Sequence, residues 1–423
     1  MHETLLVLDF GSQVTQLIAR RVRELGVYAE ILPYDAPLEK LRSLNPKGII
    51  LSGGPDSIYE PKSPRLSEAV REWVFDGRVP VLGICYGMYV MVVELGGQVG
   101  RAKQREFGHA LISVDDPSGP MTDIAPDGPT QVGHEEPVWM SHGDEVEKLP
   151  PGFRSVAHSR NCAHAAIVGG DDRMWAVQFH PEVSHTRRGT HLLGKFLDLC
   201  GYARDWSMGA FVEEAVVRIR EQVGPSGTVI CGLSGGVDSS VAAALVEQAI
   251  GERLHCIFVD NGLLRKDERA QVEAMFAGRL HNKLVVADAG ERFLAQLAGV
   301  TDPEVKRKRI GATFIEVFDE EAHKLGGADF LVQGTLYPDV IESVSARGPS
   351  ATIKTHHNVG GLPERMKMRV VEPLRELFKD EVRELGIALG LPQEMVYRHP
   401  FPGPGLGVRI LGEVRPEHAE LLR

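Results

Sequence analysis

The chain has 423 residues, of which 43% are hydrophobic and 25% are charged, as in an ordinary globular protein of about two or three domains. Its 58 acidic residues outnumber its 47 basic ones, and the net charge of −11 argues against a nucleic-acid partner. No apolar run reaches the ~18 residues of a membrane helix, so no membrane partner is expected. The N-terminus lacks the features of a signal peptide, and the 5 cysteines form no CxxC pair, which predicts a cytoplasmic location.

The first part of the chain alternates short apolar runs with amphipathic stretches. Apolar runs at 4–8, 48–51 and 79–84 each lead into a turn that contains glycine, and helical patterns follow the first and the third. This βα repetition predicts an α/β domain with a mostly parallel sheet that is covered by helices. From 105 to 178 the pattern changes, and we expect short strands and turns there.

A break in periodicity near 199–207 places a domain boundary between residues 203 and 204. A helix capped by Ser207 is expected to follow. Further apolar runs then predict a second α/β domain that extends to residue 399. These runs lie at 228–231, 254–259, 284–287 and 330–333.

The sequence Gly83-Ile84-Cys85-Tyr86-Gly87 has the GxSxG form of a nucleophile elbow, with cysteine in place of serine. It follows a predicted strand and precedes a predicted helix, which is the context that this motif needs. The glycines permit a sharp turn that exposes the sulfur, and the positive end of the helix dipole favours a thiolate. The alternative interpretation is a small buried residue in a glycine-rich turn.

A partner for this cysteine is expected at the end of the predicted strand 174–179. There His180 can act as a general base, and Glu182 can fix its tautomer through the other ring nitrogen. The alternative for one histidine among sixteen is an ordinary surface position. Backbone N–H groups for an oxyanion are expected from Tyr86 and from the glycine turn that contains Gly54.

The sequence Ser-Gly-Gly-Val-Asp-Ser-Ser follows the predicted strand 228–231 and opens an apolar helix. Glycines let backbone N–H groups converge on an anion at a helix N-terminus, and Asp238 can hold a Mg²⁺ ion that binds the phosphates. The loop lacks the lysine of a Walker A motif, which indicates a pyrophosphate site and attack at the α-phosphate of ATP. Its members are Ser234, Gly235, Gly236, Val237, Asp238, Ser239 and Ser240.

Other candidate residues follow this loop in the chain. The strand end 258–262 borders the expected ligand crevice and can form a nucleoside wall. The basic run 306–309 is either a solvated helix face or a contact for an anionic substrate. Lys354 and Lys379 are either phosphate contacts or surface lysines. Residues 344–363, which lack apolar periodicity, are either a functional lid or a disordered segment.

Taken together, these motifs resemble the glutamine-hydrolysing GMP synthases over nearly the whole chain. The motifs shared with class I glutamine amidotransferases in general are GICYG at 83–87, WMSHGD at 139–144 and VQFHPEV at 177–183. Those of the second half are SGGVDSS at 234–240, FVDNGLLR at 258–265, QGTLYPDVIES at 333–343, HHNVGGLP at 356–363 and HPFPGPGLGVR at 399–409.

This resemblance implies a role for each matching residue. Cys85 would attack the side-chain amide of glutamine, with His180 as base and Glu182 orienting it. The loop 234–240 would bind ATP with Mg²⁺, and Lys379 would close over the nucleotide. Arg307 would contact the phosphate of XMP. The O2 atom of XMP would be adenylylated with loss of pyrophosphate, and ammonia would then displace AMP to give GMP.

The chain departs from the family pattern in three places. Tyr89 stands where the family has a glutamine that helps to hold the substrate, and residues 133–137 form a small insertion. The sequence ends at Arg423, whereas family members continue through a C-terminal dimerisation domain of which 400–423 is the opening. A homodimer is expected where that domain is present.

Two other functions compete with this interpretation. A glutamine-dependent NAD synthetase would keep both half-reactions and change the acceptor, but such enzymes carry a different type of glutaminase. A non-catalytic or ammonia-only nucleotide-binding protein would be consistent with Tyr89 and with the position of the chain end. The intact Cys85, His180, Glu182 and 234–240 loop argue against a protein without activity.

Overall fold

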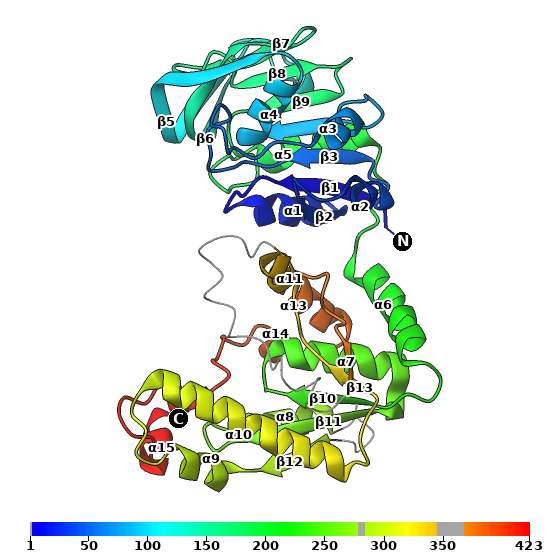
Figure 1. Cartoon of the computed structure of the whole chain (residues 1–423), viewed down its shortest axis with the longest axis vertical. Helices are drawn as coiled ribbons and strands as arrows, with labels where there is room; N and C mark the ends of the chain where they lie inside the picture. Colours follow the sequence, from blue (N-terminus) through cyan, green and yellow to red (C-terminus); the bar gives the residue numbers. More distant parts are fainter. Residues whose placement is uncertain (1, 278–283, 345–367) are drawn as a thin grey trace. The chain divides into compact units, whose positions relative to one another are not determined.

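The computed structural model describes residues 2–277, 284–344 and 368–423, with the side chains of 342–344 left out. The chain divides into two compact units, Met1–Trp206 and Ser207–Arg423, which we call unit 1 and unit 2 (Figure 1). No helix within the described residues is long and apolar enough to cross a membrane. The domain limits drawn from the sequence, including a separate segment at 400–423, stay predictions.

Unit 1 is built on a sheet whose order is β2-β1-β3-β4-β9-β8-β7-β5-β6. The pairs from β2 to β9 are parallel, and those from β9 to β6 are antiparallel. The bounds in sheet order are Tyr28–Pro33, Thr4–Asp9, Gly48–Leu51, Val81–Ile84, Met174–Val177, Ala166–Gly169, Arg154–Ser159, Gln98–Val114 and Glu135–Lys148. The central strands β1, β3, β4 and β9 are buried along almost their whole length, as expected for a sheet covered on both faces.

Helices connect the parallel strands of unit 1. The α-helices described here are α1 (Thr15–Glu24), α2 (Leu38–Ser43), α3 (Glu68–Val74), α4 (Tyr86–Glu94) and α5 (Gly189–Cys200), with a 3₁₀ turn η1 at Gly119–Met121. Leu6, Leu8, Ile49 and Leu51 from the sheet pack with Val90 and Met91 of α4 in one hydrophobic core. This packing fixes α4 on the sheet directly after β4.

The expectation of only short strands between 105 and 178 is wrong. β5 has 17 residues and β6 has 14, and they pair as one long antiparallel hairpin with irregular register near Arg101 and Glu106. Much of β5 is exposed, so polar residues and glycine interrupt its apolar pattern, and periodicity alone does not reveal its length. Residues 133–137, which the sequence suggests as an insertion, lie at the turn and at the start of β6.

Unit 2 is built on a fully parallel sheet in the order β12-β11-β10-β13-β14. The bounds in that order are Leu284–Asp288, Leu254–Asp260, Val229–Leu233, Phe330–Val332 and Arg369–Val371. The predicted α/β fold class, with two successive α/β domains, is confirmed. β10 and β11, at the centre, are nearly fully buried, and each ends at a loop that carries candidate functional residues.

The helices of unit 2 cover this sheet. Those described are α6 (Met208–Val223), α7 (Val237–Ile250), α8 (Glu268–Phe276), α9 (Gly290–Leu297), α10 (Pro303–Lys324), α11 (Tyr337–Val344), α13 (Lys379–Ala388), α14 (Gln393–Val396) and α15 (Pro416–Leu422), with 3₁₀ turns η2 (Gly251–Arg253) and η4 (Gly405–Val408). Figure 1 shows α7 and α10 on opposite sides of the sheet. Ser207 caps α6 as predicted, because its side chain accepts a hydrogen bond from the Ala210 N–H.

Candidate active sites

The turn between β4 and α4 holds Cys85 in a rare backbone conformation. Cys85 has φ +53° and ψ −106°, a region that costs a non-glycine residue strain and that is concentrated at functional sites. Glycine is required on both sides of it. A Cβ on Gly83 would lie 2.7 Å from the Gly87 carbonyl oxygen, and a Cβ on Gly87 would collide with the backbone of Leu51. The elbow predicted from the sequence is therefore present.

His180 lies just beyond β9, which is the parallel neighbour of β4. Its Nδ1 is 2.7 Å from Oε1 of Glu182, and the Glu182 side chain is fully buried. Burial alone lowers the pKa of His180, but hydrogen bonds with Cys85 and Glu182 outweigh it and raise the pKa to about 10. The site therefore favours an imidazolium beside the cysteine sulfur.

The backbone brings Cys85 and His180 together. The Cys85 N–H donates to the Val177 carbonyl at 2.8 Å, which joins the end of β4 to the end of β9. The His180 N–H donates to the Trp139 carbonyl of β6 at 3.0 Å. The Cys85 Sγ also contacts the Ser141 carbonyl oxygen of β6 at 3.6 Å. Three strands thus fix the nucleophile candidate and its partner.

The two predicted oxyanion donors lie at the same place. Tyr86 is the first residue of α4, and the N–H groups of the first helical turn have no acceptor within the helix. Gly54 packs against the ring of Tyr86, since a Cβ there would lie 3.1 Å from the ring carbon Cγ. The adjacent Gly53 packs against His180, where a Cβ would lie 3.4 Å from Cε1. The glycine turn therefore borders both the elbow and His180.

In unit 2, residues 234–236 join β10 to α7, and residues 237–240, expected as part of the loop, form the first turn of α7. Gly235 has φ +71°, which lets the chain turn into the helix. The Ser239 hydroxyl accepts from the Ser234 N–H at 3.2 Å and donates to the Gly236 carbonyl at 3.1 Å. Ser240 donates to that same carbonyl at 3.0 Å. These bonds hold the loop in one shape at the N-terminus of α7, where the helix dipole favours an anion.

Lys379 and Asp238 meet at this loop. The Lys379 Nζ lies 2.5 Å from Oδ1 of Asp238, and both side chains are partly exposed. The described residues hold no cluster of three or more His, Cys, Asp and Glu that would bind a metal by itself. A Mg²⁺ ion needs only one or two carboxylates when phosphates and water complete its shell, so Asp238 fits such an ion.

Comparison with known proteins relates both units to established families. Residues 6–200 match the class I glutamine amidotransferase family, and residues 211–305 match the NAD synthase family. A GMP synthase (glutamine-hydrolysing) of Neisseria meningitidis serogroup C is 58% identical over 424 residues, which cover 100% of this chain and 79% of the relative. One of a Nitratiruptor species is 56% identical and covers 99% of this chain and 80% of the relative.

The chain belongs to the glutamine-hydrolysing GMP synthase family. An NAD synthetase is not favoured, because the GMP synthases match unit 1 and unit 2 together. Among solved structures, a Thermoplasma acidophilum protein described as a GMP synthase subunit is 31% identical, with a TM-score of 0.42, and covers 48% of this chain and 95% of that protein.

Two residues of the basic run occupy different environments in this GMP synthase family member. Arg307, expected at the XMP phosphate, lies on α10 and contacts Glu304 at 2.5 Å. Lys306 beside it is only 1% exposed and donates to the Ile410 carbonyl at 2.6 Å, so the interpretation of the whole run as a solvated face is wrong for Lys306. The lid candidate 344–363 and Lys354 lie outside the described residues, apart from the backbone of residue 344.

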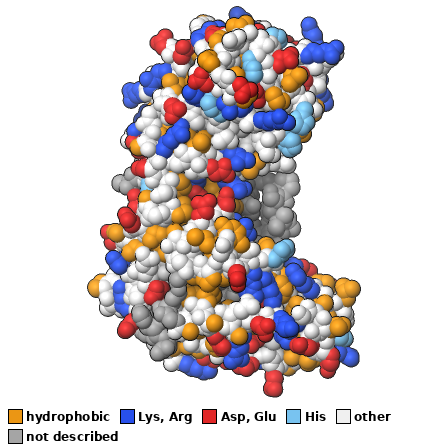
Figure 2. Space-filling model, turned by 180° about the vertical axis from the view of Figure 1, so that it is seen from behind, with side chains coloured by type: hydrophobic (Ala, Val, Ile, Leu, Met, Phe, Trp, Pro, Cys, Tyr) orange, Lys and Arg blue, Asp and Glu red, His pale blue; other side chains and the backbone are white. Residues whose placement is uncertain are grey.

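A basic cavity of about 370 Å³ in unit 2 was missed by the sequence reasoning. Five basic side chains line it, from Arg265, Lys266, Arg398, Arg409 and Arg423. Two of them contact the ring of Phe401, with the guanidinium carbon of Arg265 at 4.3 Å and that of Arg409 at 4.8 Å from the ring centre. Burial lowers the pKa of Arg265, and the charges of Arg398 and Arg409 lower it further. Figure 2 shows Lys and Arg side chains clustered on one part of the surface of unit 2.

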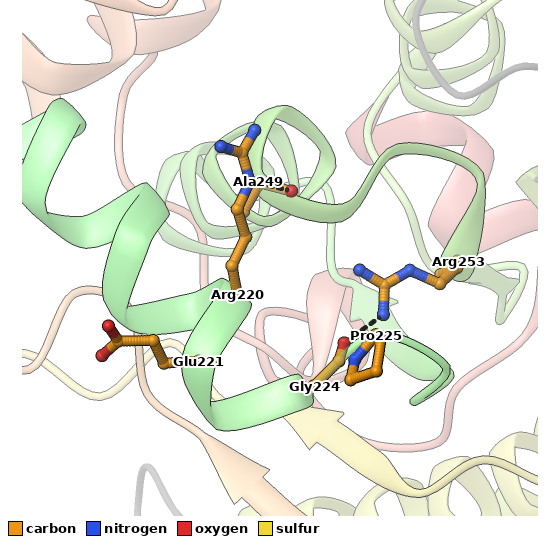
Figure 3. Close-up of a pocket in the computed structure, with 6 residues that line it drawn as sticks. All are labelled: Arg220, Glu221, Gly224, Pro225, Ala249 and Arg253. Atoms are coloured by element: carbon orange, nitrogen blue, oxygen red, sulfur yellow. Dashed lines mark hydrogen bonds between the residues drawn. The ribbon is translucent and has the colours of Figure 1, made fainter.

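The sequence signal for this cavity lies in two motifs of the second half, since Arg265 ends one and Arg409 ends the other. In a second hollow, which Arg220 and Arg253 line, both arginines bind backbone carbonyls (Figure 3). Arg220 donates to the Ala249 carbonyl at 2.7 Å, and Arg253 donates to the Gly224 carbonyl at 2.6 Å. Both arginines therefore cap helix C-termini.

Proposed function

We propose that the chain forms GMP from XMP with ATP, using ammonia that Cys85, His180 and Glu182 release from glutamine. The observation that supports the first half is that the buried His180 contacts both Cys85 and Glu182. Membership of the GMP synthase family, over essentially the whole chain, supports the overall reaction. The ammonia-only and non-catalytic alternatives lack a comparable observation.

In the proposed chemistry of unit 1, His180 first donates a proton to the leaving ammonia and later accepts one from water. The Cys85 thiolate attacks the side-chain carbonyl carbon of glutamine, and the N–H groups of Tyr86 and Gly54 bind the oxyanion. His180 gives its proton to the leaving nitrogen, so ammonia departs and a thioester remains. His180 then takes a proton from the water that attacks the thioester, the C–S bond breaks, and glutamate leaves while the thiolate of Cys85 and the imidazolium of His180 are restored.

The proposed chemistry in unit 2 begins at the loop 234–240. Backbone N–H groups of the loop and the Lys379 ammonium bind the phosphates of ATP. Asp238 would hold Mg²⁺ against those phosphates, where the ion would neutralise developing charge. The O2 atom of XMP attacks the α-phosphorus, pyrophosphate leaves, and ammonia then displaces AMP from the purine carbon. The products are GMP, AMP and pyrophosphate.

The phosphate of XMP is proposed to bind on the side of unit 2 that carries Arg307 and the basic cavity. The cavity offers several cations within a small space, and an anion there offsets the burial and the like-charge repulsion that together lower the pKa of Arg265. Lys306 links the two places, because it lies next to Arg307 in α10 and binds the carbonyl that follows Arg409. We also propose, from the resemblance, a cytoplasmic homodimer where a C-terminal dimerisation domain accompanies the chain.

The test compares nitrogen sources in the wild-type chain and in Cys85→Ala. GMP formation is measured with XMP, ATP and Mg²⁺, and with either glutamine or ammonium. The wild type should use both sources, whereas Cys85→Ala should use only ammonium, because the second unit keeps its site. Glutamine-dependent synthesis in Cys85→Ala would contradict the role of Cys85. Failure of the wild type with both sources would contradict GMP synthesis by this chain.

A further inference from the structure

Tyr89 lies on α4 one helical turn after Cys85, where its side chain reaches β6. It is 3% exposed, and its hydroxyl donates to the backbone carbonyl of Asp144 at 2.6 Å. Burial raises the pKa of Tyr89 well above its usual value, and the nearby Cys85 adds to this effect, so the hydroxyl keeps its proton and stays a donor. A buried tyrosine hydroxyl that binds a backbone atom fixes the distance between two elements.

The carbonyl that Tyr89 binds is part of a buried network. The ring Nδ1–H of His142 donates to the same Asp144 oxygen at 2.9 Å. The other ring nitrogen of His142 lies 3.2 Å from Glu106 on β5, and both side chains are buried. Tyr89 is the member that ties this network to α4.

The network continues to the nucleophile candidate. Ser141, three residues before Asp144 on β6, presents the carbonyl oxygen that contacts the Cys85 Sγ at 3.6 Å. Cys85 and Tyr89 are therefore both joined to one short segment of β6, which we call the β6 anchor (residues 141–144). A shift of this segment relative to α4 moves an atom that touches the sulfur.

A second side-chain hydrogen bond reaches the β6 anchor, but it is more exposed than that of Tyr89. The Tyr59 hydroxyl donates to the Asp144 carboxylate at 2.8 Å, and Tyr59 itself is 41% exposed. Exposed side-chain bonds constrain a strand less than buried ones, because water competes for them. Tyr89 is therefore the buried side chain that ties the β6 anchor to α4, in addition to the backbone pairing of β6 with β5.

We infer that Tyr89 is a positioning residue for Cys85, because it holds the β6 anchor at its distance from α4 and so keeps the Ser141 carbonyl where it limits the position of the sulfur beside His180. This inference rests on the proposed role of Cys85 as nucleophile. It predicts that the tyrosine hydroxyl affects the chemical step at the thiol and has no effect on the ammonium-dependent reaction of unit 2. It also gives a role to a position where the chain departs from its family pattern.

The test uses Tyr89→Phe in the full chain, which deletes the hydroxyl and keeps the ring. The kcat for glutamate release from glutamine should fall by about three- to tenfold, the range that one hydrogen bond supplies. The KM for glutamine and the rate of GMP formation from ammonium should stay at wild-type values. Tyr202→Phe is the matched control, because the Tyr202 hydroxyl is also buried and donates to a backbone carbonyl, that of Thr4, at 2.9 Å.

Other results overturn the inference. An unchanged kcat in Tyr89→Phe would show that the hydroxyl does not position the thiol. A raised KM with wild-type kcat would place Tyr89 in substrate binding instead. An equal loss in Tyr202→Phe, with equal changes in thermal unfolding, would reduce the effect to general stability. A wild-type chain that forms GMP from ammonium and releases no glutamate from glutamine would contradict the proposed role of Cys85 itself.

Discussion

Lys379 and Asp238 form an ion pair with 2.5 Å between Nζ and Oδ1, although 141 residues separate them in the chain. Lys379 is the first residue of α13, and Asp238 lies in the first turn of α7. The contact therefore joins the N-termini of two helices, whose dipoles both favour an anion. A cation and a carboxylate at this place suit a phosphate group that arrives with a metal ion.

The first prediction concerns Asp238→Asn. Asparagine keeps the size of the side chain and removes the charge that would hold Mg²⁺, so the magnesium concentration for half-maximal GMP formation from ammonium should rise by about tenfold or more. Asp267→Asn is the control, because Asp267 is exposed and asparagine tolerates its positive φ equally well. An unchanged magnesium dependence in Asp238→Asn would remove this carboxylate from the proposed metal site.

The second prediction concerns the pH dependence of glutamine hydrolysis. Glu182 is one of the two groups that raise the pKa of His180 to about 10, since a buried carboxylate stabilises the imidazolium. Glu182→Gln removes that charge, so the pKa of His180 should fall. The high-pH limb of the kcat/KM profile for glutamate release should therefore move to lower pH, and activity at high pH should be lost first.

The comparison between the wild type and Glu182→Gln isolates the change in the pKa of His180. The amino group of free glutamine titrates in the same way for the wild type and for Glu182→Gln, so a difference between their profiles reports the enzyme. GMP formation from ammonium should have the same profile in both. If the high-pH limbs coincide, Glu182 does not set the charge of His180.

Local sequence patterns were sufficient to predict the elbow, because Gly83, Cys85 and Gly87 belong to one turn whose backbone demands are local. His180 was predictable because an apolar run leads into His-Pro-Glu, although β9 ends at Val177 and is shorter than the predicted strand 174–179. The pairing of Lys379 with Asp238 and the basic cavity were not predictable, since each joins residues that only the tertiary fold brings together. The length of β5 was missed because an exposed strand need not alternate apolar and polar residues.

The burial of Lys306 was also not predictable from local sequence, and it gives the third prediction. It lies within a run of four basic residues, yet the side chain is 1% exposed and burial lowers its pKa. Ile310, four residues later, is buried on the same helix face. Lys306→Ala should lower the free energy of unfolding by about 2–4 kcal/mol, because the buried stem is lost and the Ile410 carbonyl loses its donor.

Lys308→Ala is the matched control for this prediction, since Lys308 is exposed on the same helix. It should change the free energy of unfolding by no more than about 0.5 kcal/mol. Denaturant unfolding of both variants, followed by circular dichroism, measures the difference. Equal stabilities would show that the Lys306–Ile410 bond contributes nothing to the fold.

The last prediction concerns Gly87, which faces β3 from the first turn of α4. A Cβ at this position would collide with the carbonyl oxygen and carbonyl carbon of Leu51, and neither atom belongs to a flexible side chain. Gly87→Ala should therefore push α4 away from the sheet and displace Cys85 and the Tyr86 N–H together. Glutamate release should fall by about 10²-fold, the loss expected when one oxyanion donor is misplaced, while GMP formation from ammonium continues.

Gly194→Ala on α5 is the control, because a Cβ there meets its nearest atom at an ordinary 3.6 Å and alanine favours the helix. Wild-type glutamate release in Gly87→Ala would mean that the elbow does not depend on the close contact between α4 and β3.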